Sequence, residues 1–322
     1  MENVIKLIEQ DLTKLEASIN KLVTTRVGFI KEIVNHIIKS GGKRVRPILV
    51  ILSARLCGYK GDKHIPYAAI VEFIHTATLL HDDVVDNAQT RRGASTANTI
   101  WGNEASVLVG DFLYAKSMEL LADEGNSEIF GVMASTTKSL SEGEILELTK
   151  TSDIETSEED YFEIIGNKTA VLFSVACETG AILGKINDHK KSSLKNFGYN
   201  LGMAFQLQDD ILDYTSYDNV LGKRVGTDIK EGKVTLPLIH AISSANDKEK
   251  FSIQKVLGKS HVTDRDFERI RKIILEYDGI EYTIDKTRKY TDAAKECLDV
   301  FGTSPYKEAL LTLTDYMLSR KT

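Results

Sequence analysis

The chain has few of the residues that mark secreted or β-rich proteins. It contains three cysteines, Cys57, Cys177 and Cys297, which are far apart and lack the spacing of a metal-ligand motif. An odd number of scattered cysteines favours reduced core residues over a disulfide framework, as expected of a cytoplasmic protein. Four prolines, and no alternating segments bounded by Asn-Gly or Asp-Gly turns, argue against a β-sheet fold.

Long apolar runs and an excess of basic charge are also missing. No uninterrupted apolar stretch reaches the roughly 18 residues that suggest a membrane-spanning helix. The N-terminus, MENVIKLIEQDLTKLEASINKL, is charged throughout and lacks the apolar centre of a signal peptide. The formal net charge is −6, which disfavours a general role in nucleic-acid binding. The sequence therefore predicts a soluble protein without a transmembrane segment or a nucleic-acid partner.

Helical periodicity, by contrast, is present along the chain. An opening amphipathic helix is predicted by apolar residues in steps of three and four, namely Ile5, Ile8, Leu12, Leu15, Ile19 and Leu22. This stripe needs a partner, either the rest of the chain or a second subunit. Short polar breaks such as SGGKRVRP, CGYKGDKHIP and TSDIETSEED separate the helices, and Thr156 with Glu159 fits a capping box. We expect one all-α domain over residues 1–322, a large helical bundle around a central cavity.

Two segments, residues 68–80 and 197–208, are apolar on most faces and are expected at the centre of the bundle. The first is followed by DDVVD and the second by DDILD. A single Asp-Asp-x-x-Asp pattern on a helix is more often a solvated surface. Two copies, each at the end of a central apolar helix, favour a functional site instead.

The spacing of these aspartates indicates a metal site. Residues four apart share a face of a helix, so Asp82 lies with Asp86, while Asp83 is rotated by about 100°. Two such helices facing each other gather carboxylates whose repulsion calls for cations. Mg²⁺ prefers oxygen ligands and, when few of them are carboxylates, keeps positions open for phosphate oxygens. The candidate ligands are Asp82, Asp83, Asp86, Asp209, Asp210 and Asp213.

Two basic segments supply groups for a second anion site. GGKRVRP places Lys43, Arg44 and Arg46 after flexible glycines, and TRRG places Arg91 and Arg92 directly after the first aspartate pattern. Either alone is typical of a charged loop. Together they predict a metal-independent site, because guanidinium groups bind diphosphate oxygens through paired hydrogen bonds. The sequence thus predicts two diphosphate sites.

Six motifs, in the order GGKRVRP, HDDVVD, RRG, GNKT, FQLQDDILD and GKRVGTDIKEGK, resemble those of the trans-isoprenyl diphosphate synthases over nearly the whole chain. The segments EFIHTATLLHDDVVD and GNEASVLVGD are most similar to long-chain members of the octaprenyl diphosphate type, which make quinone side chains. The resemblance implies a Mg²⁺-dependent homodimer that condenses isopentenyl diphosphate with an allylic diphosphate.

The resemblance also implies individual roles. Mg²⁺ ions that bridge the allylic diphosphate would be bound by Asp82, Asp86 and Asp209, with Asp83, Asp210 and Asp213 completing the metal environment. Isopentenyl diphosphate would be held by Lys43, Arg46, His75 and Arg92. The allylic diphosphate would contact Arg91, Lys168, Lys223 and Lys233. Thr169 and Gln206 would present oxygen dipoles to the allylic cation. Without the resemblance, a lone histidine such as His75 on a buried helix is more often a core residue.

Two further expectations concern closure and product length. The polar stretch 215–233 is too long for an ordinary connector and predicts a lid that carries Lys223 and Lys233. One helical turn advances 5.4 Å, so side chains one turn before Asp82 meet the growing tail first. There Ala77 and Thr78 are small, which predicts an open floor and a product of about forty carbons. The deeper closure is expected from Ile74, Val71, Met118 or Met133.

Three alternatives stay open. A farnesyl or geranylgeranyl diphosphate synthase is disfavoured by the small Ala77 and Thr78. A class I terpene cyclase needs no isopentenyl site, so GGKRVRP and the second aspartate pattern argue against it. A non-catalytic regulatory subunit of a heteromeric synthase would typically lack one motif. Turnover by the purified chain alone distinguishes this last alternative from an enzyme.

Overall fold

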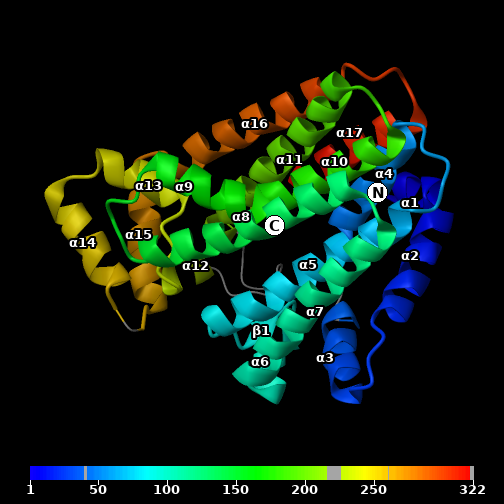
Figure 1. Ribbon diagram of the computed structural model, residues 1–322. Helices are drawn as coiled ribbons and strands as arrows, with labels where there is room; N and C mark the ends of the chain where they lie inside the picture. The colour runs from blue at the N-terminus through cyan, green and yellow to red at the C-terminus, as the bar shows by residue number, and fades with distance from the viewer. Residues whose placement is uncertain (40–41, 216–225, 260, 320–322) are drawn as a thin grey trace.

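The computed structural model describes residues 1–39, 42–215, 226–259 and 261–319, and its regular structure is almost wholly helical (Figure 1). The helices are α1 (Glu2–Leu7), α2 (Glu9–Leu22), α3 (Gly28–Lys39), α4 (Val45–Leu56), α5 (His64–Val85), α6 (Ala97–Trp101), α7 (Asn103–Glu124), α8 (Ser127–Lys150), α9 (Glu158–Ile165), the π-helical turn η1 (Gly166–Ala170), α10 (Val171–Gly184), α11 (Asp188–Thr215), α12 (Thr227–Lys230), α13 (Leu236–Ser244), α14 (Asp247–Leu257), α15 (Asp264–Glu276), α16 (Gly279–Cys297) and α17 (Pro305–Leu318). The predicted all-α class is confirmed. Across the described ranges, no helix combines the length and apolar character needed to cross a membrane.

The central helices are α4, α5, α10 and α11. Both segments predicted to be central are buried, since Phe73 of α5 and Phe197 of α11 have almost no exposed surface. Between α4 and α11 lies α10, whose side chains from Leu172 to Leu183 are all buried. No motif in the sequence marks α10 as central, because its apolar run is not followed by an aspartate pattern.

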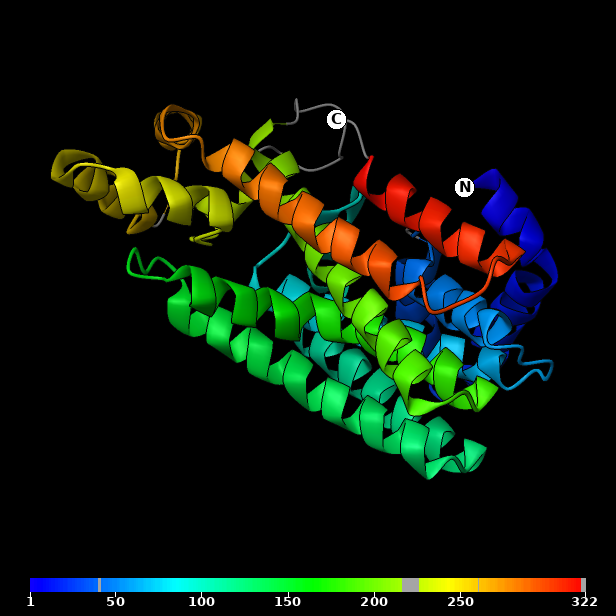
Figure 2. The same cartoon turned by 90° about the horizontal axis from the view of Figure 1, so that it is seen from above.

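A second hydrophobic cluster lies around α13, α14 and α15, at the end of the molecule opposite α1 and α2 (Figures 1 and 2). Helix α11 joins the two clusters, because Leu201 packs in the first and Leu207 in the second. The second aspartate pattern begins at Asp209, two residues after Leu207. It therefore projects from α11 where the two clusters meet.

The predicted opening helix is divided into α1 and α2 at Ile8, which has φ −119° and ψ 22°. Helix α1 packs against α17, so the first and last helices of the chain lie side by side (Figure 2). Helix α2 packs against α5 through buried Leu15 and Ile19. The apolar stripe, whose partner the sequence left open, is thus covered by the chain's own bundle, although Ile5 stays exposed.

The capping box predicted at Thr156 and Glu159 is wrong by one residue. The Ser157 hydroxyl accepts from the backbone N–H of Asp160 (3.0 Å), and the Asp160 carboxylate accepts from the backbone N–H of Ser157 (3.0 Å). The Thr156 hydroxyl instead donates to the carbonyl of Asp153 (2.7 Å). Thr and Ser are both good cap residues, so the sequence alone did not separate them. The true cap begins α9 at Glu158.

Candidate active site

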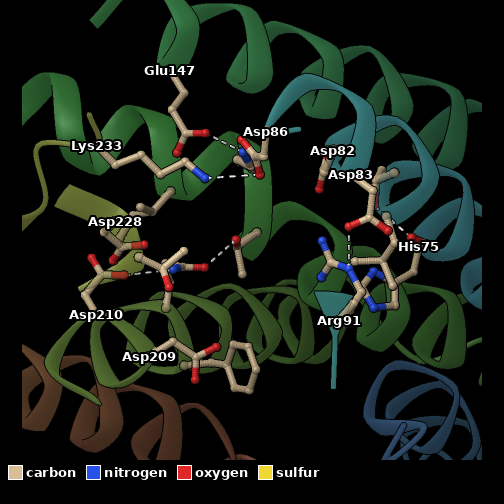
Figure 3. Close-up of a pocket in the computed structure, with 18 of the residues that line it drawn as sticks. His75, Asp82, Asp83, Asp86, Arg91, Glu147, Asp209, Asp210, Asp228 and Lys233 are labelled. Carbon is tan, nitrogen blue, oxygen red and sulfur yellow. Dashed lines mark hydrogen bonds and ion pairs between the residues drawn. The ribbon is translucent and has the colours of Figure 1, made fainter. Parts of the chain in front are cut away.

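A cavity of about 880 Å³ lies at the junction of the two hydrophobic clusters (Figure 3). Every predicted site residue that the structure describes lines it: Lys43, Arg46, His75, Asp82, Asp83, Asp86, Arg91, Arg92, Lys168, Thr169, Gln206, Asp209, Asp210, Asp213 and Lys233. Lys223 and most of the predicted lid, residues 216–225, lie outside the described residues. Residues more than a hundred positions apart in the sequence therefore share one space.

The two basic segments meet at one end of the cavity. A β-carbon on Gly42 would lie 2.9 Å from the Arg92 guanidinium, so the two segments approach closely here. Arg92 sits in a short hairpin formed by β1 (Thr90–Arg91) and β2 (Ala94–Ser95), where it and Gly93 have φ values of 53° and 78°. Two consecutive positive φ values are typical of a type I′ turn. The Arg-Gly turn lacks the Asn-Gly or Asp-Gly pair that predicts a hairpin, so the sequence did not predict this one.

Arg44 lies between Lys43 and Arg46, which are predicted to bind isopentenyl diphosphate. Its own side chain forms contacts within the protein. Arg44 has φ 48°, a strained value for a residue with a side chain. Its guanidinium pairs with Glu72 of α5, whose side chain is only 7% exposed, and donates to the carbonyl of Ile38 (3.3 Å). This pair ties the loop to α5. Lys43, by contrast, places its ammonium 4.6 Å from the centre of the Tyr316 ring.

Arg46 and His75 contact each other. Arg46 Nη1 lies 3.1 Å from His75 Nε2. Because arginine only donates, Nε2 is the acceptor and Nδ1 carries the ring proton. Burial, reinforced by the charge of Arg46 and neighbouring arginines, lowers the pKa of His75 well below its usual value. His75 is therefore a neutral side chain that accepts a hydrogen bond from Arg46.

The first aspartate pattern lies at the C-terminal end of α5, with Asp86 as its cap residue. Asp83 is almost fully buried and accepts from Arg91 Nε (2.8 Å). Asp86 lies 3.2 Å from the ammonium of Lys233 (Figure 3). Burial raises the pKa of Asp82 to about 7. Two of the three carboxylates thus have protein cations beside them, and the third is in an environment that disfavours its negative charge.

The second aspartate pattern is held by hydrogen bonds. Asp210 accepts from the Tyr161 hydroxyl (2.5 Å) and from Gln206 Nε2 (2.8 Å). Asp213 accepts from the backbone N–H groups of Thr227 (3.2 Å) and Asp228 (3.1 Å). Burial raises the pKa of Asp210 to about 7, although its two hydrogen bonds act in the opposite direction. Both oxygens of Asp210 and both oxygens of Asp213 therefore accept hydrogen bonds within the protein.

Two lysines approach the aspartates, Lys168 from η1 and Lys233 from the segment before α13. Lys168 lies in the π-helical turn η1, a distortion often found at functional sites. It pairs with Glu147 and with Glu144 (2.7 Å) of α8. Burial alone would lower the pKa of Lys168, but the carboxylates of Glu147, Asp82 and Glu144 together outweigh burial and raise the pKa. Gly143 allows this, because a β-carbon there would lie 2.7 Å from the backbone nitrogen of Lys168.

Sequence reasoning missed three residues that line the cavity: Tyr161, Glu147 and Asp228. Glu147 belongs to EGEILEL, which reads as an ordinary solvated helix face. Asp228 lies beside the second aspartate pattern (Figure 3), where burial followed by repulsion from Asp213 raises its pKa well above the usual value. Asp228 belongs to the motif GKRVGTDIKEGK. The resemblance of this motif to the family was the one feature of the sequence that could have indicated a role for Asp228.

The carboxylates fit Mg²⁺ bound together with a phosphate ligand rather than a preformed metal cage. Among the described residues, no three histidine, cysteine or acidic side chains converge as a ready metal cluster. Mg²⁺ is commonly held by one or two carboxylates plus substrate phosphates. Burial raises the pKa of Asp82 to about 7, so a cation beside it would stabilise its charged form. Asp86 has the Lys233 ammonium at 3.2 Å, which a phosphate ligand would draw away when a metal ion binds. Asp82, Asp86 and Asp209 would hold the ions.

Opposed aspartate patterns, two lysines and a separate arginine-lined end, in one cavity of a helical bundle, are features of an enzyme that acts on diphosphate esters. Residues 27–274 match the family model described as Polyprenyl synthetase, and the chain belongs to this family. It is therefore a prenyltransferase.

The relatives cover the chain almost completely. The octaprenyl diphosphate synthase of Haemophilus influenzae is 38% identical over 99% of this chain and 97% of its own. The geranyl-diphosphate-specific all-trans-nonaprenyl-diphosphate synthase of Rhodobacter capsulatus is 37% identical over 99% and 98%. A crystal structure of the polyprenyl synthase of Caulobacter crescentus, complexed with calcium and isoprenyl diphosphate, superposes with a TM-score of 0.95 at 40% identity over 100% and 98%. These similarities place the chain with the long-chain trans-prenyl diphosphate synthases.

Proposed function

We propose that this chain extends an allylic diphosphate with isopentenyl diphosphate, in a Mg²⁺-dependent reaction, to a trans-polyprenyl diphosphate of about forty carbons. The observation that carries this proposal is the division of one cavity into two anion-binding ends. The aspartate end, with Lys168 and Lys233, suits an allylic diphosphate bound with metal. The other end, with Lys43, Arg46 and Arg92, suits isopentenyl diphosphate without metal.

The proposed reaction starts when the allylic carbon–oxygen bond breaks and the diphosphate leaves with the electron pair. Lys168 and Lys233 stabilise the charge that develops on the leaving oxygens, and bound Mg²⁺ supplies further Lewis-acid stabilisation. The isopentenyl double bond attacks the allylic cation, a carbon–carbon bond forms, and the proton lost from the adduct goes to the departed diphosphate. Apolar side chains such as Phe173 and Phe205 keep water from the cation.

The proposed product length rests on the small residues before Asp82 and on the long-chain relatives. Thr78 lines the cavity, and its hydroxyl donates to the carbonyl of His75 (2.8 Å). Ala77, Ile74 and Met133 are packed without exposed surface. A tail of this length therefore needs these residues to move apart.

The test incubates the purified chain with farnesyl diphosphate, labelled isopentenyl diphosphate and Mg²⁺, and sizes the dephosphorylated products by reversed-phase chromatography. We expect a series of products whose longest member has about forty carbons. Asp209→Asn should abolish product formation. Products that stop at fifteen or twenty carbons would keep the reaction and refute the length. No incorporation with any allylic primer would favour the regulatory-subunit alternative. A quinone side chain is the proposed destination; in a host whose own synthase is replaced by this chain, quinone tails should take the length made in vitro.

We also propose that the chain is a homodimer through α7 and α8. These helices follow one another along the chain, are joined by a short turn and contact each other. Large apolar side chains are exposed on both helices, with Leu108 66% and Ile145 61% exposed. Leu108→Arg should convert a dimer into a monomer in analytical ultracentrifugation, whereas Phe251→Arg, 67% exposed on distant α14, should not. A monomeric wild type would refute the proposal.

A further inference from the structure

Tyr161 is the first residue of a chain of hydrogen bonds in the cavity wall. Its hydroxyl donates to Asp210 Oδ2 (2.5 Å), and Gln206 Nε2 donates to Asp210 Oδ1 (2.8 Å). The Thr169 hydroxyl then donates to Gln206 Oε1 (2.9 Å). These residues come from α9, α11 and η1, and all of them line the cavity. The chain thus links a buried phenol to a hydroxyl expected beside the allylic cation.

Each bond in this chain fixes the direction of the next. A carboxylate only accepts, whereas a carboxamide has one donating and one accepting end. Because Asp210 takes the nitrogen end of Gln206, the carbonyl end of Gln206 faces Thr169. The single proton of the Thr169 hydroxyl is then committed to that carbonyl. Any further group that meets this hydroxyl in the cavity meets oxygen lone pairs.

Tyr161 is well placed to set this direction because it is itself held rigidly. Its side chain is only 3% exposed and belongs to the second hydrophobic cluster, and its ring packs edge-on against Phe162 with centroids 5.5 Å apart. The capping box at Ser157 and Asp160 fixes the turn of α9 from which it projects. With Tyr161 as a fixed donor on one oxygen, Asp210 presents its other oxygen to Gln206.

We propose that Tyr161 is a positioning residue which, acting through Asp210 and Gln206, turns the oxygen lone pairs of Thr169 toward the allylic cation. This inference rests on the proposed function, since it assigns a direction to a dipole in that reaction. Without the Tyr161 hydroxyl, Asp210 can rotate, the Gln206 amide can reverse, and Thr169 can point its proton into the cavity. A proton directed at a developing cation opposes its formation.

The test compares Tyr161→Phe with Tyr282→Phe. The control removes the same kind of bond, from a tyrosine hydroxyl to a carboxylate. Tyr282 of α16 donates to the Glu158 carboxylate of α9 (2.7 Å) but takes no part in the chain to Thr169. We expect Tyr161→Phe to lower kcat about tenfold, the order expected for one misdirected partner of a developing charge. The KM values of both diphosphates and the half-maximal Mg²⁺ concentration should stay within about twofold. Tyr282→Phe should match the wild type.

A double-mutant cycle tests whether Tyr161 acts through Thr169. In a Thr169→Val background, Tyr161→Phe should change kcat by less than about twofold, whereas in Thr169→Ser, which keeps the hydroxyl, the tenfold effect should persist. Gln206→Leu, which breaks the chain at its middle, should likewise remove the Tyr161 effect.

Three results would overturn the inference while leaving the proposed function intact: additive effects in the cycle, an equal loss of kcat in Tyr282→Phe, or a raised Mg²⁺ requirement that accounts for the whole loss. An inactive wild type would refute the proposed function and, with it, this inference. Thermal unfolding of each variant identifies any loss of kcat that comes from unfolded protein.

Discussion

Replacing Glu72 with Gln should weaken isopentenyl diphosphate binding without changing any residue assigned to contact the substrate. Glu72 is the buried partner of Arg44, and Arg44 has a strained φ of 48° between Lys43 and Arg46. Such a conformation costs about 1–3 kcal/mol and persists only where contacts impose it. The Gln side chain keeps the shape of Glu72 but loses the charge. The loop that carries Lys43 and Arg46 should therefore relax.

The expected size of the effect follows from the contacts that remain. A charged group left without its buried partner costs about 1–3 kcal/mol. Arg44 keeps its bond to the Ile38 carbonyl and a 3.4 Å contact with Glu16, and its side chain is 16% exposed. The lower half of that range applies, so about 1.4 kcal/mol corresponds to a tenfold rise in the KM for isopentenyl diphosphate. The kcat and the KM for the allylic diphosphate should change by less than about twofold.

The matched control is Glu16→Gln, because Glu16 contacts the same guanidinium but is 52% exposed. Exposed ion pairs contribute only about 0–1 kcal/mol, so this variant should keep the wild-type KM within about twofold. Steady-state kinetics with each substrate varied in turn gives both KM values, and circular dichroism verifies the fold. A folded Glu72→Gln with an unchanged KM for isopentenyl diphosphate would refute the reasoning, as would equal rises in both variants.

Three further outcomes are expected. Thr78→Tyr places a ring in the cavity one turn before Asp82 and should shorten the main product on reversed-phase chromatography; an unchanged length contradicts the open floor. Since burial raises the pKa of Asp82 to about 7 from 3.8, the metal-free folded protein binds a proton that the unfolded chain has released, so its Tm in EDTA should fall as pH rises from about 4 to 7. Mg²⁺ should reverse that fall, and Asp82→Asn should show a smaller slope. Gly143→Ala forces a β-carbon against η1 and should lower stability by about 1–3 kcal/mol in urea unfolding, with a parallel loss of kcat; wild-type stability would contradict this.

The helices were predictable from the sequence because their apolar periodicity is local. The aspartate patterns were predictable as well, because each repeats at helical spacing directly after a buried run. The division of the first helix at Ile8 was not predictable, since the apolar stripe continues across it. The same holds for the cap at Ser157, where adjacent residues compete for one role.

The site residues that could not be predicted from the sequence have a different explanation. Tyr161 and Glu147 contact Asp210 and Lys168 only after α8, α9, η1 and α11 have packed together. Neither contact leaves a trace in local spacing, and an isolated Tyr or Glu on an amphipathic helix is ordinary. The positive φ values of Arg44 and Arg92 could not be predicted either, because arginine has no preference for the left-handed region of φ and ψ. Tertiary packing imposes these features.

The ion pairs inside the cavity restrict what it can bind. Lys233 is paired with Asp86, Lys168 with Glu147, and Arg91 with Asp83. A diphosphate alone would draw the lysines away and leave buried carboxylates without cations. Mg²⁺ alone at Asp86 would place a second cation beside the ammonium of Lys233, which also lies 2.7 Å from Glu231, so the two cations would repel each other. A buried carboxylate left without a cation costs several kcal/mol. A diphosphate bound together with Mg²⁺ replaces both partners at once. The charge pairs within the protein therefore disfavour each ligand separately and favour their joint binding.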